Sequence, residues 1–454
     1  MRTVTRIEIV GLFGYAHHVV NLRSTEPTII VAPNGAGKTH VLRLTAALLA
    51  LDGQTLIETT YRKLTLEFSG GKALVVDREV GPDGPTVRIS AASQPGEETE
   101  SVVFTLEELD IERALPAGIV KTAAGRWFNE RTGAYLSEND LRRRYDFDVD
   151  ALATRARKVP AIAELCGGNR PVFIDTWRLD ARAEDPRMLG EWGGRRIRSN
   201  TAAASRIRGY THMLSEEITE ARRASVQATQ SADLSFARRA LQGARSTVRE
   251  SDLHKRYDNT VERYEALARN GLAVGERPMA FPDKTTPTDR RILSVFLDDW
   301  DRRLEPLLPV NEKLEALRDI LDTKLAPSGK KTSISARGGL EFHNVAGHRL
   351  PVARLSSGEQ HLVALFTLLL FAARPGSLVL IDEPEISLHA AWKHAFLADI
   401  TRVAALSNLQ VLLATHSSGI VNGRWDLTEE LELTSQIPAT ASEDIDDLSE
   451  DFDE

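Results

Sequence analysis

The sequence is poor in the features that mark secreted and membrane proteins. It has 454 residues and one cysteine, Cys166, so no disulfide can form within the chain. This usage is typical of proteins in reducing compartments. The N-terminal segment has no apolar core of secretory length. The longest apolar run, residues 362–373, is shorter than the roughly 20 residues that a membrane-spanning helix needs. We therefore expect a cytoplasmic protein with no membrane partner.

Basic residues are absent from the C-terminal end. Residues 442–454 contain eight Asp and Glu and neither Lys nor Arg, whereas the formal net charge of the whole chain is -8. The remainder of the chain is therefore neutral in sum. Acidic runs of this kind are usually solvated and disordered. We predict an acidic disordered tail over residues 431–454.

Hydrophobic patterning predicts a mixed α/β chain with a helical middle. Residues 61–107 alternate and carry glycine turns, which predicts an antiparallel meander. Residues 106–165 have a mostly helical, irregular pattern. Residues 200–325 have a helical period broken near 273–289, and they lack the unbroken heptads of a long coiled coil. Further strands are expected at residues 4–10, 17–22, 28–32 and 170–179, and short strands within 332–353. Over residues 355–425 we expect helices and apolar strands to alternate.

A glycine-rich loop follows the apolar strand at residues 28–32 and opens a helix over residues 38–50. Its sequence is APNGAGKT, residues 32–39, and in this context it is a Walker A motif. Glycines let successive N–H groups face phosphates, and the helix N-terminus favours an anion. Lys38 would neutralise phosphate oxygens, and the Thr39 hydroxyl would ligate Mg²⁺. The residues expected to bind the nucleotide are Asn34, Gly35, Ala36, Gly37, Lys38 and Thr39.

The Walker A pattern departs from the usual one at its first position, where Ala32 replaces glycine. If that position requires a positive φ, alanine would destabilise the loop by ~1 kcal/mol. We do not expect this to inactivate the loop.

An apolar strand within residues 377–389 ends in two acidic residues. Asp382 falls at the carboxyl end of the strand, where ligands of α/β sheets bind, and would hold Mg²⁺ through its water shell. Glu383 would polarise the attacking water as general base. The other interpretation of the pair is helix capping after a core strand, which the accompanying Walker A motif disfavours.

Two further segments carry candidate site residues. In LSSGEQ, residues 355–360, Ser356 and the N–H of Gly358 lie at a predicted helix start that could bind an anion, although a plain serine N-cap explains the same pattern. Residues 410–419 form a buried strand that ends at His416, which could donate a hydrogen bond to a γ-phosphate. A lone histidine is more often structural.

Together and in this order, the motifs resemble the ABC-type ATPase heads of SMC, Rad50, RecF and OLD-like proteins, with a D-loop at Ser387–His389. The resemblance covers residues 1–105 and 330–425. It implies a P-loop NTPase fold of ABC-ATPase head type, a mixed β-sheet with flanking helices and an inserted helical arm. The divisions expected are an N-terminal lobe 1–180, the arm 181–330, a C-terminal lobe 331–430 and the tail 431–454.

The resemblance also implies a slow, dimerisation-dependent ATPase that uses ATP and Mg²⁺. In that family two heads sandwich ATP, so Ser356 and Gly358 would contact the γ-phosphate across a homodimer or higher homo-oligomer. The Q-loop glutamine has no clear counterpart, since Trp177 stands where a polar residue would help. Two interpretations are open for Phe13 and Tyr15: one of them stacks on adenine, or both pack in the core.

The segment from Ile381 to Leu427 looks similar to compact bacterial ATPases paired with a nuclease in phage defence, such as Septu- and PARIS-type systems. No nuclease motif is visible in this sequence, so an effector nuclease or toxin would be another chain. The alternative is an SMC- or RecF-like ATPase acting on DNA in repair or recombination. A transporter subunit is disfavoured by the long insertion and by the missing Q-loop.

Residues 151–256 contain 20 Lys and Arg against 12 Asp and Glu. Such stretches can bind the phosphate backbone of nucleic acid without reading its sequence. The other interpretation is a solvated helical face whose arginines pair with its own acids. The most concentrated arginines are Arg195, Arg196, Arg198, Arg206 and Arg208.

Overall fold

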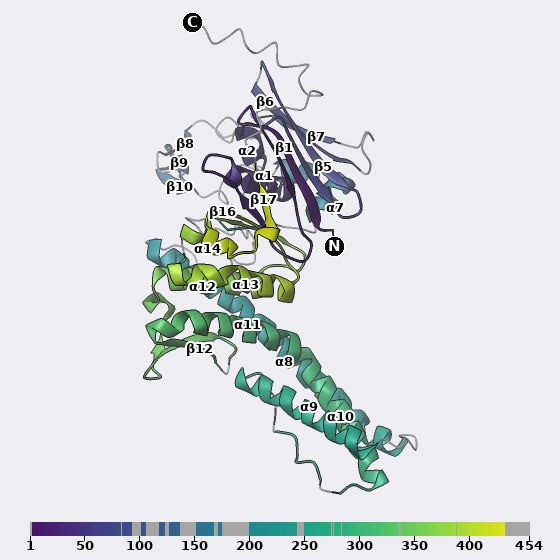
Figure 1. Ribbon diagram of the computed structural model, residues 1–454. Helices are drawn as coiled ribbons and strands as arrows, with labels where there is room; N and C mark the ends of the chain where they lie inside the picture. The colour runs from purple at the N-terminus through teal and green to yellow at the C-terminus, as the bar shows by residue number, and fades with distance from the viewer. Residues whose placement is uncertain are drawn as a thin grey trace. The chain divides into compact units, whose positions relative to one another are not determined.

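The computed structural model divides the chain into two compact units, each built from separated segments (Figure 1). The first unit comprises Met1–Ala183, Arg374–Ile386 and Asn408–Glu454, and the second comprises Glu184–Ala373 and Ser387–Ser407. The residues that the structure describes are 2–82, 84–92, 101–105, 118–122, 127–136, 151–167, 171–174, 199–242, 249–273, 275, 277–282, 284–335, 337–386 and 388–431.

The first unit contains a six-stranded antiparallel sheet in the order β2-β1-β4-β5-β6-β7. Alternate residues of β4 and β6 are buried, which is the pattern that the alternating sequence predicts. The meander expected over residues 61–107 is therefore confirmed. The strands are β1 (Val4–Leu12), β2 (Ala16–Asn21), β4 (Lys63–Phe68), β5 (Ala73–Gly81), β6 (Gly84–Ala92) and β7 (Ser101–Thr105).

A second, five-stranded sheet of the same unit is parallel throughout, in the order β11-β15-β16-β3-β17. Every residue of β15 and β16 is buried, as expected for central parallel strands covered on both faces. Because β3 neighbours β16 and β16 neighbours β15, their carboxyl ends lie along one edge of the sheet. The strands are β3 (Thr28–Val31), β11 (Val172–Ile174), β15 (Leu378–Asp382), β16 (Gln410–Thr415) and β17 (Thr428–Glu430).

Helix α1 (Lys38–Ala50) lies against β11, β15 and β16 and brings one face of the parallel sheet into the core of the first unit. Its bounds are those that the sequence predicts. The unit also contains α2 (Gly53–Glu58), α6 (Ala151–Ala156), α7 (Pro160–Gly167) and α14 (Ser418–Val421).

One expectation for the first unit was wrong. Residues 118–136 were expected to be helical, but where described they form a small antiparallel sheet of β8 (Ile119–Lys121), β9 (Trp127–Asn129) and β10 (Ala134–Leu136). These strands have three residues each, too few for a sequence period to show. The strand expected at 170–179 is present as β11, and residues 170 and 175–179 lie outside the described residues.

The second unit is mainly helical, and it contains the helices expected over residues 200–325, with a break between residues 270 and 286. Within it, α10 packs against both α8 and α9 (Figure 1). Its elements are α8 (Ser199–Gln242), α9 (Glu250–Arg269), α10 (Pro287–Leu304), α11 (Leu308–Leu325), β12 (Lys330–Ile334), β13 (Leu340–Asn344), β14 (Arg349–Leu350), α12 (Ser357–Thr367) and α13 (Ala390–Ser407).

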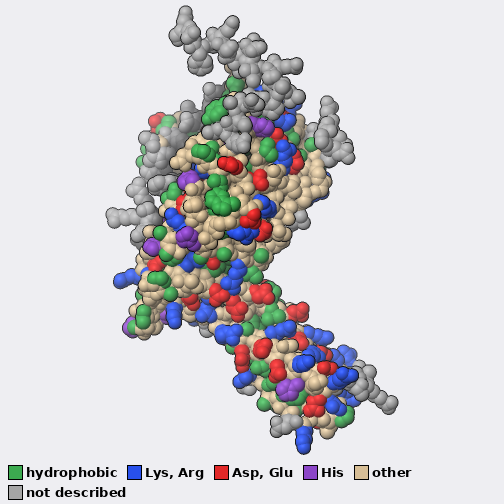
Figure 2. Space-filling model, viewed as in Figure 1, with side chains coloured by type: hydrophobic (Ala, Val, Ile, Leu, Met, Phe, Trp, Pro, Cys, Tyr) green, Lys and Arg blue, Asp and Glu red, His purple; other side chains and the backbone are tan. Residues whose placement is uncertain are grey.

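Acidic and basic side chains are interspersed over the surface of the helical arm, residues 199–325 (Figure 2). Arg239 pairs with Asp299 at 2.7 Å, and Arg256 pairs with both Asp298 and Asp301. These arginines are therefore neutralised by the arm itself. Within the described part of the chain, no helix is long and apolar enough to cross a membrane.

Candidate functional site

The loop of residues 32–37 joins the end of β3 to the start of α1 in the first unit. Gly35 and Gly37 have φ of 86° and 90°, which only glycine adopts without strain. At Gly37 there is also no room for a side chain, since a Cβ there would lie 2.8 Å from Cδ2 of Leu12 and 3.3 Å from Phe13. Ala32 has no positive φ, so the replacement of the usual glycine there introduces no backbone strain.

Lys38 is almost fully buried, with 5% of its surface exposed. Its ammonium donates hydrogen bonds to the carbonyl oxygens of Ala32, at 2.8 Å, and Pro33, at 3.2 Å. The lysine thus curls over the loop that it follows. Helix α1 begins at Lys38 without a side-chain N-cap, which leaves the first-turn N–H groups able to bind an anion.

The residues expected to hold Mg²⁺ form a suitable set of donors. Asp382 is the last residue of β15 and is 4% exposed, and Thr39 is in the first turn of α1. One carboxylate and one hydroxyl, completed by phosphate oxygens and water, are the ligands that Mg²⁺ prefers. Elsewhere among the residues with a described placement, no cluster of three or more His, Cys, Asp or Glu could hold a metal ion.

Glu383 follows β15 in a left-handed backbone conformation with φ of 44°. Its N–H donates to the carbonyl of Ala414 at 2.8 Å, which fixes it beside the tip of β16. Non-glycine residues in this region are destabilised by about 1–3 kcal/mol and are concentrated at functional sites. The Oε1 atom of Glu383 lies 3.4 Å from Nδ1 of His416, so the structure brings these two predicted residues together.

Glu385 is a third side chain at this edge, and the sequence interpretation did not identify it. It is 8% exposed, and its Oε1 accepts hydrogen bonds from the Thr415 hydroxyl at 2.7 Å and from the N–H of His416 at 3.1 Å. The same oxygen is 3.9 Å from Nε2 of His416. The only sequence signal was a second glutamate two residues after Glu383, which without the fold looks like an ordinary turn residue.

Aromatic residues lie beside the glycine loop. Phe13 and Tyr15 have 38% and 51% of their surface exposed, so core packing does not account for them. Phe13 also contacts His40 of α1 edge to face, with ring centroids 4.8 Å apart. Burial, reinforced by Arg43, lowers the pKa of His40.

A buried histidine lies under the glycine loop. His18 is 2% exposed, and its Nε2 would be 3.6 Å from a Cβ at Gly37. Burial lowers the pKa of His18 and outweighs the opposing effect of the Ala36 backbone. Burial thus favours the neutral form of His18, which packs against the phosphate loop.

The predicted signature residues are in the second unit. Ser356 is the N-cap of α12, where its hydroxyl accepts from the N–H of Glu359 and the Glu359 carboxylate accepts from the N–H of Ser356. Gly358 is in the first turn of the same helix. The serine N-cap weighed against a phosphate contact is therefore present in this structure.

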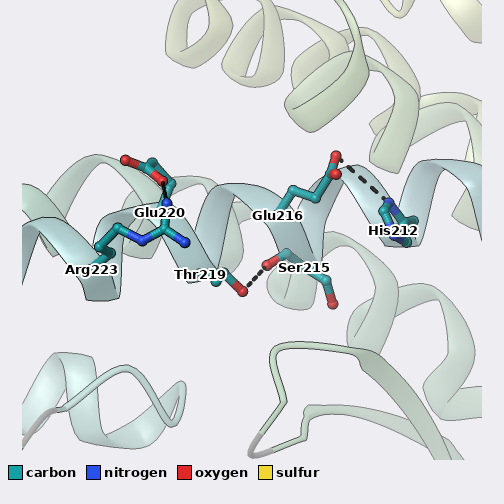
Figure 3. A pocket seen from close by; sticks show the side chains of 6 residues that line it. All are labelled: His212, Ser215, Glu216, Thr219, Glu220 and Arg223. Carbon is teal, nitrogen blue, oxygen red and sulfur yellow. Dashed lines mark hydrogen bonds and ion pairs between the residues drawn. The ribbon is translucent and has the colours of Figure 1, made fainter. Parts of the chain in front are cut away.

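Several expectations fall outside the described residues: Trp177, Arg195, Arg196, Arg198, Ser387 and the tail over residues 432–454. A shallow pocket on α8 contains none of the motif residues (Figure 3). Its lining residues pair along the helix, His212 with Glu216 at 3.6 Å and Arg223 with Glu220 at 3.0 Å. It offers no separate site.

A glycine loop between a parallel strand and a helix, with an acidic strand end on the same sheet, defines a P-loop nucleotide-binding protein. Residues 194–422, just over half of the chain, match the family described as "AAA domain, putative AbiEii toxin, Type IV TA system". The chain belongs to this family, and it is an ATPase of the AAA type with a mixed α/β fold.

No curated protein matches the sequence significantly. Similar solved structures include the Smc head domain with an extended coiled coil bound to the C-terminal domain of ScpA, derived from Pyrococcus furiosus. Its sequence is 15% identical, its TM-score is 0.36, and the match covers 96% of this chain and 94% of that chain. An SMC head bound to the C-winged helix domain of ScpA has 13% identity, a TM-score of 0.30 and coverages of 92% and 90%. The SMC head domain from Thermotoga maritima has 10% identity, a TM-score of 0.30 and coverages of 94% and 92%.

Proposed function

We propose that the chain binds Mg²⁺-ATP at the loop of residues 32–39 and hydrolyses it at the carboxyl edge of the parallel sheet. The supporting observation is that β3, β16 and β15 are neighbours, so Lys38, His416 and Glu383 follow adjacent strand ends. Glu383 acts as general base toward water, a role suited to a carboxylate held beside a buried strand. Thr39 and Asp382 hold Mg²⁺, which neutralises charge on the phosphates.

His416 donates to the γ-phosphate in this proposal, and its contact with Glu383 at 3.4 Å supports a shared role. Asn34 and the backbone of Gly35, Ala36 and Gly37 bind the phosphates. Ser356 and Gly358 of one copy contact the γ-phosphate held by a second copy, which makes turnover slow and dependent on a homodimer or higher homo-oligomer. The uncapped start of α1 supports the phosphate assignment.

The biological role that we propose is the ATPase subunit of a bacterial anti-phage defence system that controls a separate effector nuclease or toxin. The family's description, a putative toxin of a type IV toxin–antitoxin system, supports a role within such a system, and the separate effector is our own addition to it. The alternative, an ATPase acting on DNA in repair or recombination, depends on nucleic-acid binding by residues 151–256. The pairing of Arg239 and Arg256 with arm acids gives it less support.

Two substitutions test the nucleotide site. Lys38→Ala should weaken ATP binding at least 100-fold, because it removes the cation at the phosphates. Glu383→Gln should retain ATP affinity within about threefold but lower the turnover number at least 100-fold, as expected for loss of a general base. Binding is measured by calorimetry and turnover by phosphate release, with Lys158→Ala, at an exposed lysine outside the site, as control. Unchanged ATP affinity in Lys38→Ala would contradict the placement of the site.

The partner is tested by affinity purification of the Glu383→Gln protein together with its genomic neighbours, followed by mass spectrometry and analysis of bound nucleic acid. A stoichiometric nuclease or toxin supports the defence role. An isolated dimer that carries DNA supports the repair alternative.

A further inference from the structure

The tip of β16 is held by one buried carboxylate. Glu385, in the short helical turn Pro384–Ile386, accepts a hydrogen bond from the Thr415 hydroxyl and another from the backbone N–H of His416. The Thr415 hydroxyl in turn accepts from the N–H of Ser417 at 3.0 Å. These bonds join the segment that follows β15 to Thr415, at the end of β16, and to His416, and they tie Ser417 to the same Thr415 hydroxyl.

The ring of His416 is therefore bracketed by two glutamates. Its Nδ1 is 3.4 Å from Glu383, and its Nε2 is 3.9 Å from Glu385. The backbone beside it is fixed as well, since the N–H of Glu383 bonds to Ala414. Both the position of the His416 backbone and the direction of its ring thus depend on contacts with the turn of residues 383–386.

Glu385 is more than an incidental surface acid. Its side chain is 7% exposed, and its Oε2 is buried without a hydrogen-bond partner. Burying a carboxylate with one oxygen unsatisfied is unfavourable by roughly 1–3 kcal/mol or more. An apolar residue that packed equally well would avoid this penalty, so the acceptor oxygen of Glu385 has a use at this position.

We propose that Glu385 is the positioning residue of the hydrolytic site, which holds His416 beside Glu383 in the orientation needed for the γ-phosphate. This inference rests on the proposed function. Glu385 acts through His416 and through the end of β16. A misplacement of about 1 Å in such a group can slow a reaction by about 100-fold.

Kinetics of the full-length protein test the proposal. Glu385→Ala should lower the turnover number about 10- to 100-fold with ATP affinity within twofold, because the phosphate loop is untouched. Glu385→Gln should stay within about threefold of wild type, because an amide oxygen can accept the same two hydrogen bonds. Glu79→Ala, at an exposed glutamate of β5, is the control and should match wild type.

A double-mutant cycle distinguishes positioning through His416 from a general structural effect. If Glu385 acts through His416, Glu385→Ala should change the turnover number by no more than twofold in the His416→Ala background. If the two residues act independently, the losses in turnover number should multiply. Multiplying losses, or a normal turnover number in Glu385→Ala, would overturn the proposal.

Hydrogen exchange of the nucleotide-free protein separates this inference from the proposed function. Glu385→Ala should speed exchange of the amides of residues 415–417 at least tenfold, because their local opening becomes easier, while peptides of α7 stay unchanged. An unchanged rate at residues 415–417 overturns the positioning role whatever the activity. If wild type hydrolyses no ATP, the proposed function fails and the exchange rates alone decide whether Glu385 holds His416.

Discussion

At the scale of single residues, the site combines motif residues with a side chain that acts through one specific contact. Lys38, Thr39, Asp382 and Glu383 could be named from the sequence because each belongs to a motif of fixed spacing. Glu385 could not, because its function lies in a contact with Thr415 and His416, thirty residues further along the chain. A local pattern does not encode which buried acceptor a strand end will meet.

Gly35 and Gly37 offer a matched pair for testing the loop. Both have positive φ, but a Cβ at Gly35 would meet nothing within 4 Å, whereas one at Gly37 would clash with Leu12 at 2.8 Å. Replacing either by alanine should introduce backbone strain of about 1 kcal/mol. Gly37→Ala should be destabilised by roughly 1–3 kcal/mol more, because of overpacking. Thermal unfolding measures this difference. Equal melting temperatures for the two variants would show that Leu12 can move away from a Cβ at position 37 without loss of stability.

At the scale of elements, the hydrophobic pattern of the sequence predicted the elements that are long or that are apolar throughout. Helix α1 and the strands of the meander follow their patterns, and so do the buried runs of β15 and β16. The three-residue strands β8 to β10 could not be predicted, because they contain less than two full periods. Their pairing is set by neighbours in the fold and not by their own residues.

The start of α12 allows an element-scale prediction with a defined pH dependence. Burial would raise the pKa of Glu359, but hydrogen bonds from Lys330, the Ser356 N–H and Ser328 outweigh it and hold the pKa below its ordinary value of 4.5. A carboxyl whose pKa is lowered on folding stabilises the protein above its unfolded pKa, and this contribution is lost as the pH falls through the folded value.

Glu359→Gln should therefore lower the melting temperature at neutral pH, by an amount corresponding to about 1–3 kcal/mol. The difference from wild type should shrink as the pH falls below about 4.5. Glu312→Gln, at an exposed position of α11, should match wild type throughout. Melting curves from pH 7 to pH 3.5 measure this, and a difference that grew on acidification would mean that the ion pair with Lys330 is not the source of the effect.

At the scale of the whole molecule, the first unit is assembled from distant parts of the chain, and Gln410 joins them. This residue begins β16 and is 5% exposed. Its Oε1 accepts from the N–H of Val4 at 3.1 Å, and its Nε2 donates to the carbonyl of Val4, at 2.6 Å, and to that of Arg23, at 3.0 Å. One side chain thus links the antiparallel sheet to the parallel sheet across 406 residues of sequence.

Removing this amide should leave buried backbone groups of β1 without partners, each destabilising by about 1–3 kcal/mol. Gln410→Ala should therefore be among the most destabilising single changes to a polar residue in the first unit. Gln227→Ala, at an exposed glutamine of α8, should have almost no effect. Hydrogen exchange should place the loss in β1 and in the β3–β16 pair together, because the tether connects both sheets. Faster exchange in β16 alone would mean that the two sheets hold together without Gln410, through the apolar core between them.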